Sequence, residues 1–325
     1  MAKKKTNKKQ AADLPKWLAS ALAVVLVIGG IGVAGAKSMG KDTAWAEQFL
    51  AGLDQFLYGE TAVVPAGPVE GTLQVDIIDV GQGESILITT ADTAVLIDAG
   101  ENNKGNVVLD HLAARGVERL DIAIGTHPHS DHIGGLDTVL ESIPADVVLM
   151  GYVPEKRLPT TKTYLDLLDV MNRKNIPLEI PEPGQQYQVG DGVLTILGPV
   201  GEYDDLNNCS LICRLDFGEV SFLFSGDAEE ISEQAVLKSG ANVDVDVMTM
   251  GHHGSSTSSS KAYFQAASPE YAAISCGKDN DYGHPHRETI TKLKNADVTY
   301  YRTDLSGTIT YITDGTEIIK VETER

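Results

Sequence analysis

The sequence feature that most constrains this chain is a run of four potential metal ligands in six residues, with the pattern H-x-H-x-D-H. It lies between an apolar, strand-like segment and a helix-like segment. Alternate residues of an extended segment point to one side, so His127 and His129 can bind one ion together. Asp131 and His132 fall where the chain turns into the helix and face a neighbouring position. The pattern therefore predicts a site for a pair of metal ions.

The distribution of the other histidines supports this prediction. Of the eight in the chain, two are adjacent at His252 and His253, and two more are His284 and His286. Histidines in Gly- and Ser-rich turns after apolar strands are typical of imidazole ligation. One of His252 and His253 is expected to bind metal and the other to contact substrate, and the sequence does not distinguish them. The alternative is that both are ordinary loop residues.

Composition restricts the partners of this site. The formal charge is -20 over 325 residues, and residues 1–36 contribute +5 from six lysines and one aspartate, which leaves -25 for the remainder. An acidic domain repels nucleic-acid backbones unless metals or a local basic patch intervene, which counts against tight, extended DNA binding. Hydrolysis of a short phosphodiester at a dication site remains compatible with this charge. The three cysteines are too few for a disulfide framework and are predicted to be core residues.

The N-terminus predicts a membrane location. Lysines precede an uncharged apolar run at 17–36, long enough to cross a hydrocarbon core of ~30 Å. The lysines hold the N-terminus in the cytoplasm, so the remainder lies outside as a single-pass plasma-membrane protein. The alternative is secretion after cleavage of a signal peptide near Ala36. The predicted division is a basic cytoplasmic tail at 1–16, a transmembrane signal anchor at 17–36, a linker with a short helix at 37–71 and a globular domain at 72–325.

Within the globular domain, strands and helices recur in two similar halves. Each half begins with several short strands and continues with alternating helices and strands. Three of the expected helices matter for the site, because they follow candidate ligands: 133–141, 228–239 and 258–267. This order predicts an α/β fold with two sheets packed face to face and helices outside.

Several motifs together resemble a known family. L-I-D-A-G (96–100), H-P-H-S-D-H (127–132), F-S-G-D (224–227) and G-H-H-G-S (251–255) occur in the order of the metallo-β-lactamase superfamily, whose fold is an αββα sandwich. D-V-G-Q-G-E-S, N-N-C-S, S-G-D-A-E and Y-G-H-P-H resemble the C-terminal hydrolase domain of ComEC-type competence proteins. The resemblance covers about 72–313. It implies a stand-alone, membrane-tethered relative, since only one membrane span is predicted.

The resemblance also implies roles for single residues. Asp227 matches the carboxylate that bridges two metals, although D-x-x-E before a helix is also a capping-box pattern. Asp98 matches a carboxylate that supports the metal loop, with a turn cap as the alternative. His284 is a candidate proton donor or substrate contact, and together with His286 it could instead cap the following helix.

Weaker candidates for contacts near the site are Asp79, Asn208 and Ser255, each with a turn or loop role as the alternative. Two departures from the family pattern concern the first metal. ComEC-type domains usually carry an aspartate where this chain has His129, and residues 204–210 occupy the region of the superfamily's third histidine. One metal site is therefore expected to be oxygen-rich or weak.

The chemistry expected from these residues is hydrolysis by a water that two divalent ions activate. His127 and His129 hold one ion, and Asp131, His132 and one of the paired histidines hold the other. Zinc suits the imidazoles, and manganese is the alternative. The resemblance implies a phosphodiester substrate: extracellular DNA, a nucleotide or an envelope component. The alternatives are hydrolysis of an ester, thioester or β-lactam on the same metals, and a non-catalytic surface binding module.

Overall fold

The computed structural model describes residues 68–325. The predicted cytoplasmic tail, the transmembrane segment and nearly all of the linker lie outside these residues. Within the described part of the chain, none of the helices combines the length and the apolar character that a membrane crossing requires.

The first half of the chain builds a mixed sheet that the C-terminal hairpin completes. Its parallel strands are β3 to β6, and the other pairs are antiparallel. The eight strands lie in the order β15 (Ile318–Thr323), β14 (Ile309–Thr313), β1 (Leu73–Ile77), β2 (Ile86–Thr89), β3 (Ala94–Ile97), β4 (Leu120–Gly125), β5 (Ala145–Met150) and β6 (Leu178–Glu179).

The second half builds another mixed sheet, in which β10 to β13 are parallel and β7 to β10 are antiparallel. The seven strands lie in the order β13 (Thr299–Arg302), β12 (Tyr271–Ile274), β11 (Val247–Thr249), β10 (Val220–Phe224), β9 (Ile212–Phe217), β8 (Gly192–Gly198) and β7 (Gln186–Val189).

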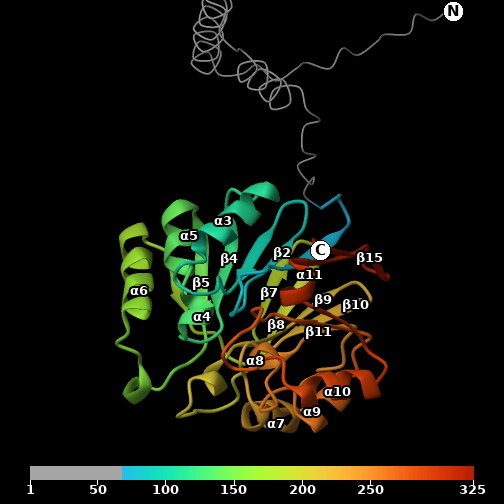
Figure 1. Ribbon diagram of the computed structural model, residues 1–325. Coiled ribbons are helices and arrows are strands. Elements are labelled where there is room, and N and C mark those ends of the chain that lie inside the picture. Colours follow the sequence, from blue (N-terminus) through green and yellow to red (C-terminus); the bar gives the residue numbers. More distant parts are fainter. Residues whose placement is uncertain (1–67) are drawn as a thin grey trace, which may run out of the picture. The chain divides into compact units, whose positions relative to one another are not determined.

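Helices connect the strands, and the longer helices cover the outer faces of both sheets (Figure 1). The helices are α3 (Gly105–Ala114), α4 (Ser130–Ile133), α5 (Leu136–Ser142), α6 (Lys162–Lys174), α7 (Glu230–Ser239), α8 (Gly251–Gly254), α9 (Lys261–Ala267), α10 (Arg287–Asn295) and α11 (Thr303–Ser306), with the 3-10 turns η1 (Glu155–Arg157) and η2 (Asn207–Cys209).

Three apolar clusters separate four layers. The central cluster lies between the sheets, where the rings of Phe222 and Tyr311 meet edge to face with centroids 6.5 Å apart. One outer cluster packs α3, α5 and α6 on the first sheet, and the other packs α7, α9 and α10 on the second. Strands buried on both faces are apolar at nearly every position, as sheets covered on both sides require. The predicted αββα sandwich is therefore confirmed, and the three cysteines are buried as predicted.

The helix expected at 133–141 is broken in the structure. The segment forms α4 and α5, which meet at Gly134 and Gly135. The Gly135 amide donates to the Gly100 carbonyl, and a Cβ at residue 135 would lie 2.3 Å from the Ala99 carbonyl oxygen. The break follows from this close approach of two backbones, which periodicity alone does not reveal.

The helix that follows Asp227 also starts later than expected. α7 begins at Glu230 and its N-cap residue is Glu229, so the capping-box interpretation of Asp227 is wrong. Similarly, the helix expected at 258–267 begins only at Lys261. In both cases the residues before the helix are held by contacts with the loops of the candidate site.

Candidate metal centre

The candidate site lies where loops from both sheets meet at the carboxyl ends of parallel strands. Asp98 follows β3, the central histidine motif follows β4, Asp227 follows β10, and His252 and His253 follow β11. Ligands in open α/β sheets bind at this end of the strands, because the loops there converge.

The predicted ligands form two groups that share one carboxylate. The first group is His127, His129 and Asp227, and the second is Asp131, His132, Asp227 and His253. In each group one ligand atom per residue lies within 4.8 Å of every other. The structure thus brings together six of the seven predicted metal ligands, and His252 lies at the edge of the groups and not within them.

The first group points two imidazoles at each other. His127 Nε2 lies 2.9 Å from His129 Nδ1 and 3.8 Å from Asp227 Oδ2. His252 Nε2 approaches the same carboxylate oxygen at 3.5 Å from the opposite wall. His127 is buried and His129 is half-buried, so this group opens toward solvent through His129.

The second group is more deeply buried and uses the other oxygen of the shared carboxylate. His132 Nε2 lies 3.1 Å from Asp227 Oδ1, and His253 Nε2 lies 3.6 Å from the same oxygen and 3.2 Å from Asp131 Oδ2. Each Asp227 oxygen therefore faces a different group, which is the arrangement that a bridging carboxylate requires.

Hydrogen bonds behind the ligands fix the orientation of two imidazoles. His132 Nδ1 donates to Asp98 Oδ2 at 2.7 Å, and His253 Nδ1 donates to the Ser275 carbonyl at 3.0 Å. Each bond occupies the Nδ1 proton, so the neutral ring presents the lone pair of Nε2 to the group. Asp98 also accepts from the amide and hydroxyl of Thr126, at 2.8 and 2.6 Å. The structure therefore places Asp98 behind His132, the position predicted for a carboxylate that supports the metal loop.

The turn that carries the paired histidines is conformationally demanding. His252 and His253 have φ values of +51° and +54°, a region that costs non-glycine residues free energy and is kept only by surrounding contacts. The Gly251 amide donates to Ser259 Oγ at 3.0 Å, and the buried carboxylate of Glu233 accepts from the Ser259 amide. The loop before α9 therefore anchors the histidine turn.

The turn after β1 closes the site from the first sheet. The Glu84 amide donates to the Asp131 carbonyl at 3.0 Å, and a Cβ on Gly83 (φ +133°) would lie 2.4 Å from that same oxygen. Glu84 is buried behind His132 and Asp98. Burial raises the pKa of Glu84 to about 7, although the charge of His132 opposes the shift.

The electrostatics of the two groups favour ionised carboxylates. Burial alone would raise the pKa of Asp227, but the charges of His132 and His253 outweigh burial and lower it well below its usual value. Burial and the neighbouring His132 lower the pKa of His127, so this ring is neutral. The pKa values of His132 and His253 are raised against the effect of burial, chiefly by Asp227. A cation that binds here displaces protons from these two rings.

The donor set fits divalent metal ions. His132 Nε2 and Asp227 Oδ1 are buried, and neither atom has a hydrogen bond among the described residues, although they lie 3.1 Å apart. Buried polar atoms without partners cost free energy unless something satisfies them. Imidazole nitrogens and carboxylate oxygens converging on one point are the usual ligands of zinc and of manganese.

An open pocket of about 330 Å³ gives access to the two groups. It is lined by His129, Ser130, Asp131, Asp227, His252, His253 and His284, together with Gln82, Asn207 and Tyr282. The last three are not among the site residues predicted from the sequence. Gln82 lies within a turn pattern and Asn207 within an Asn-Asn pair, and nothing local in the sequence shows that these side chains face the pocket.

His284 reaches the pocket as expected, and burial together with the charges of His253 and His252 lowers its pKa to about 4. Besides the ligands and Asp98, which are described above, four predicted residues have other contacts and do not line the pocket. Asp79 forms an ion pair with Arg325, Asn208 accepts from the amide of Glu229, Ser255 accepts from the amide of Thr257, and His286 accepts from the amide of Ser256.

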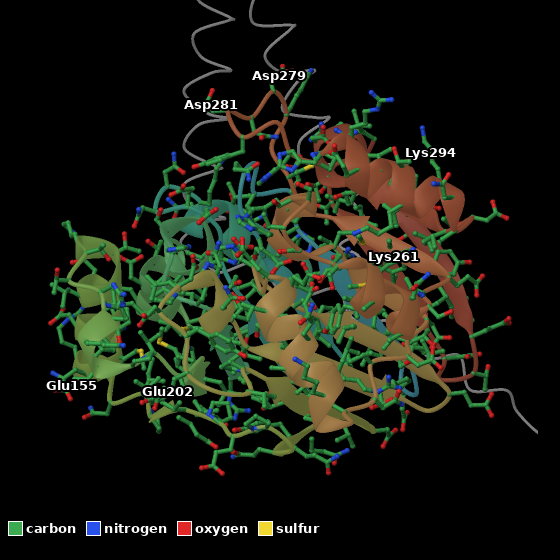
Figure 2. All side chains as sticks on the ribbon, turned by 90° about the horizontal axis from the view of Figure 1, so that it is seen from below. Glu155, Glu202, Lys261, Asp279, Asp281 and Lys294 are labelled. Carbon is green, nitrogen blue, oxygen red and sulfur yellow. The ribbon has the colours of Figure 1, made fainter. Side chains whose placement is uncertain are left out.

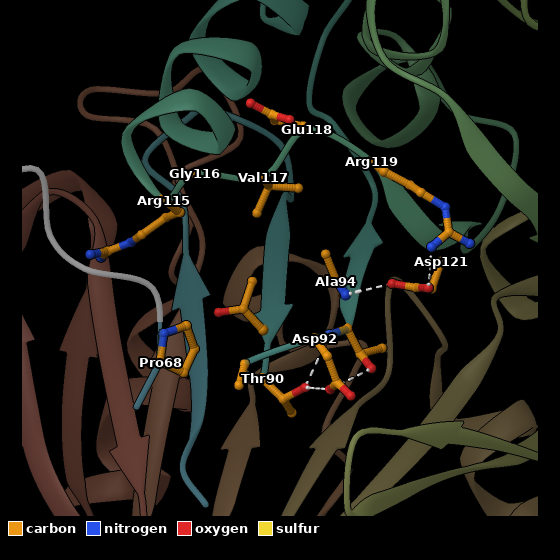
Figure 3. Close-up of a pocket in the computed structure, with 13 residues that line it drawn as sticks. Pro68, Thr90, Asp92, Ala94, Arg115, Gly116, Val117, Glu118, Arg119 and Asp121 are labelled. Atoms are coloured by element: carbon orange, nitrogen blue, oxygen red, sulfur yellow. Dashed lines mark hydrogen bonds and ion pairs between the residues drawn. The ribbon is translucent and has the colours of Figure 1, made fainter. Parts of the chain in front are cut away.

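A second cavity, of about 520 Å³, lies on the first sheet near the starts of β3 and β4 (Figure 3). Two of its charged groups already have partners: Arg119 lies 3.1 Å from Asp121, which also accepts from the Ala94 amide at 2.8 Å. As far as the structure describes the chain, its lining carries neither histidine nor cysteine. Among the described residues, the two ligand groups therefore adjoin the histidine-lined pocket and not this cavity.

Comparison with known proteins agrees with this geometry. The profile of the family described as Metallo-beta-lactamase superfamily matches residues 78–278. ComE operon protein 3 of Bacillus subtilis is 30% identical over 259 residues, which is 73% of this chain and 33% of that protein. Competence protein ComA of Neisseria gonorrhoeae is 29% identical over 309 residues, 93% of this chain and 39% of that protein. The chain thus spans between a third and two fifths of these relatives.

Among solved structures, the metallo-beta-lactamase fold protein YhfI from Bacillus subtilis superposes with a TM-score of 0.50 at 13% identity. The match covers 74% of this chain and all of that one, and at this identity it shows the fold alone. The chain belongs to the metallo-beta-lactamase superfamily, is related to the competence proteins, and carries the His and Asp groups of a metal-dependent hydrolase.

Proposed function

We propose that this protein is a two-metal phosphodiesterase, anchored to the plasma membrane by residues 17–36 with its hydrolase domain outside the cell. The observation that carries the proposal is the position of Asp227, whose two carboxylate oxygens face different groups of imidazole and carboxylate ligands. Two ligand groups joined by one carboxylate are suited to paired divalent ions, which serve in-line displacement at phosphorus.

In this proposal, His127 and His129 hold one ion, and Asp131, His132 and His253 hold the other. When bound, the ions supply an activated water and neutralise charge on the attacked phosphoryl group. The protein's own contribution is orientation. The Asp227 amide donates to Ser210 Oγ at 3.1 Å, which fixes the backbone from which the shared carboxylate projects.

His284 is assigned a hydrogen bond to the substrate. The lowered pKa, about 4, leaves its ring neutral near pH 7. A neutral imidazole is a weak proton donor toward a leaving group. The sequence-based alternative of proton donation is therefore less consistent with its surroundings than substrate contact is.

One relative is named a competence protein, and this name favours DNA or a nucleotide as the substrate over an envelope component. Two alternatives to phosphodiester hydrolysis remain. Hydrolysis of an ester, thioester or β-lactam would use the same metal ligands. A surface binding module would have no catalytic activity, whether or not it binds metal.

The test uses the full-length chain in detergent, with metal content measured by inductively coupled plasma mass spectrometry. We expect about two ions per chain, hydrolysis of bis-p-nitrophenyl phosphate, and little hydrolysis of nitrocefin. Asp227→Asn should lose at least about 100-fold in kcat/KM, because one substitution weakens both ligand groups. Asp246→Asn is the matched control, since this aspartate accepts from the Ser221 amide away from the pocket.

Two outcomes would contradict the proposal. Cleavage of nitrocefin without cleavage of the phosphodiester would favour the β-lactam or ester alternative. A full-length chain that holds no divalent ion and turns over neither substrate would favour a binding module.

A further inference from the structure

The pocket beside the metal centre is lined by two chemically different sets of side chains. One set is the imidazoles and carboxylates of the two ligand groups. The other set includes Gln82, Tyr282 and His284, an amide and two aromatic rings that take no part in those groups. A substrate that fills the pocket therefore meets charge at its reacting group and a planar, uncharged surface beside it.

Gln82 contributes a hydrogen-bond donor that no described residue uses. Its Oε1 accepts from the Gly277 amide at 3.0 Å, which fixes the orientation of the side-chain amide. The Nε2 atom is buried and has no partner among the described residues, and the same holds for His284 Nδ1. A buried polar atom without a partner costs about 1–3 kcal/mol, so these two atoms indicate a polar ligand and not an apolar chain.

Tyr282 presents an aromatic face at the rim. Its side chain is 66% exposed, and its ring stacks on His284 with centroids 5.6 Å apart and an angle of 22° between the planes. An exposed tyrosine on the surface is ordinary by itself. Here it lines the pocket that gives access to the two ligand groups, together with Gln82 and His284.

The loop that carries Tyr282 is held in shape by Asn280. The Asn280 amide nitrogen donates to the carbonyls of Gly277 and His284 at 2.8 and 2.6 Å. Its oxygen accepts from the amides of Tyr282 and His284 at 3.2 and 3.0 Å. These four hydrogen bonds hold the loop in one conformation before a ligand binds. Stacking of a ligand on Tyr282 therefore costs the loop little conformational entropy.

The charges on the loop limit the size of the ligand. Asp279 and Asp281 precede Tyr282 on the same loop and are exposed (Figure 2). They repel an extended polyanion that would run across the rim. The pocket volume of about 330 Å³ is also at the lower end of the range for ligand sites.

We propose that Gln82, Tyr282 and His284 form a nucleobase subsite, so that the preferred substrate is a nucleotide phosphodiester or a short single strand. The base stacks on Tyr282, as bases stack on aromatic side chains in single-strand binding sites. Its edge accepts from Gln82 Nε2. This inference rests on the proposed phosphodiesterase function for the reaction at the adjacent ligand groups.

The test compares two esters with the same leaving group, thymidine 5′-(p-nitrophenyl phosphate) and methyl p-nitrophenyl phosphate, on the full-length chain. We expect kcat/KM for the thymidine ester to be about 5- to 100-fold higher, the range that base stacking supplies. Tyr282→Ala should bring the ratio of the two values toward one, and Tyr282→Phe should keep it, because a phenyl ring still stacks. Tyr152→Ala is the matched control, an exposed tyrosine outside the pocket lining.

A binding measurement separates this subsite from the proposed reaction. Thymidine 5′-monophosphate and methyl phosphate are titrated into wild type and Tyr282→Ala by calorimetry. Tighter binding of the nucleotide that depends on Tyr282 supports the subsite even if neither ester is cleaved, in which case only the proposed reaction fails. Equal binding of both phosphates overturns the subsite. Cleavage of both esters at equal rates also overturns the subsite, but it leaves the phosphodiesterase proposal intact.

Discussion

Asp98 offers a sharp test of how the metal centre is held. Its carboxylate accepts three hydrogen bonds, from the Thr126 amide at 2.8 Å, from the Thr126 hydroxyl at 2.6 Å and from His132 Nδ1 at 2.7 Å. In Asp98→Asn, one carboxylate oxygen becomes an NH₂ group. Whichever way the amide turns, a donor then faces a donor.

The size of the effect follows from these contacts. A hydrogen bond to a charged group contributes about 1.5–3 kcal/mol, and residues that orient metal-binding histidines typically change metal affinity by about 10- to 100-fold. We therefore expect Asp98→Asn to bind the ion of the second group about 10- to 100-fold more weakly. His127 and His129 are not bonded to Asp98, so the first group should change less.

The assay is competition between the full-length chain and a chromophoric chelator for Zn²⁺, repeated with Mn²⁺. Asp121→Asn is the matched control. Its carboxylate accepts from the Ala94 amide at the opposite end of β4, and an asparagine oxygen can do the same. If Asp98→Asn binds metal within about twofold of wild type while remaining folded, the orientation of His132 does not depend on Asp98 and the reasoning is refuted.

Three further substitutions follow from the structure. His253→Ala should lose about one of two bound ions in mass spectrometry whereas His252→Ala keeps both, because only His253 belongs to a ligand group; equal losses would refute this assignment. Gly83→Ala should lower the unfolding free energy by about 2–4 kcal/mol in urea, since its Cβ would lie 2.4 Å from the Asp131 carbonyl oxygen; a neutral effect would show that the turn relaxes. Burial raises the pKa of Asp76, but its bonded histidine and arginine lower it overall, so its contribution is present above pH 3.8 and is lost as pH falls below that value. Asp76→Asn should therefore cost about 3 kcal/mol at pH 7 and clearly less at pH 3, and an equal cost at both pH values would contradict this.

The sequence by itself was sufficient to predict the layers of the fold and most of the candidate ligands. Strands buried on both faces read as short apolar runs, and the turns after them contain the histidines and aspartates. These signals are local, because a strand end and the residues that follow it are adjacent in the chain. The same locality explains why Asp131 and His132 could be separated from His127 and His129 by spacing alone.

The tertiary structure determined the directions of the side chains, which the spacing of residues in the sequence cannot predict. It placed the two oxygens of Asp227, which comes from the second sheet, toward two groups built mainly on the first, and it selected His253 over its neighbour. Both depend on side-chain direction, which the packing of distant loops imposes on residues with unusual φ values. Gln82 and Tyr282 reach the pocket for the same reason: their loops meet only when the two sheets pack face to face. The sequence shows which strand a residue follows. Which groups its side chain faces is determined only by the tertiary structure.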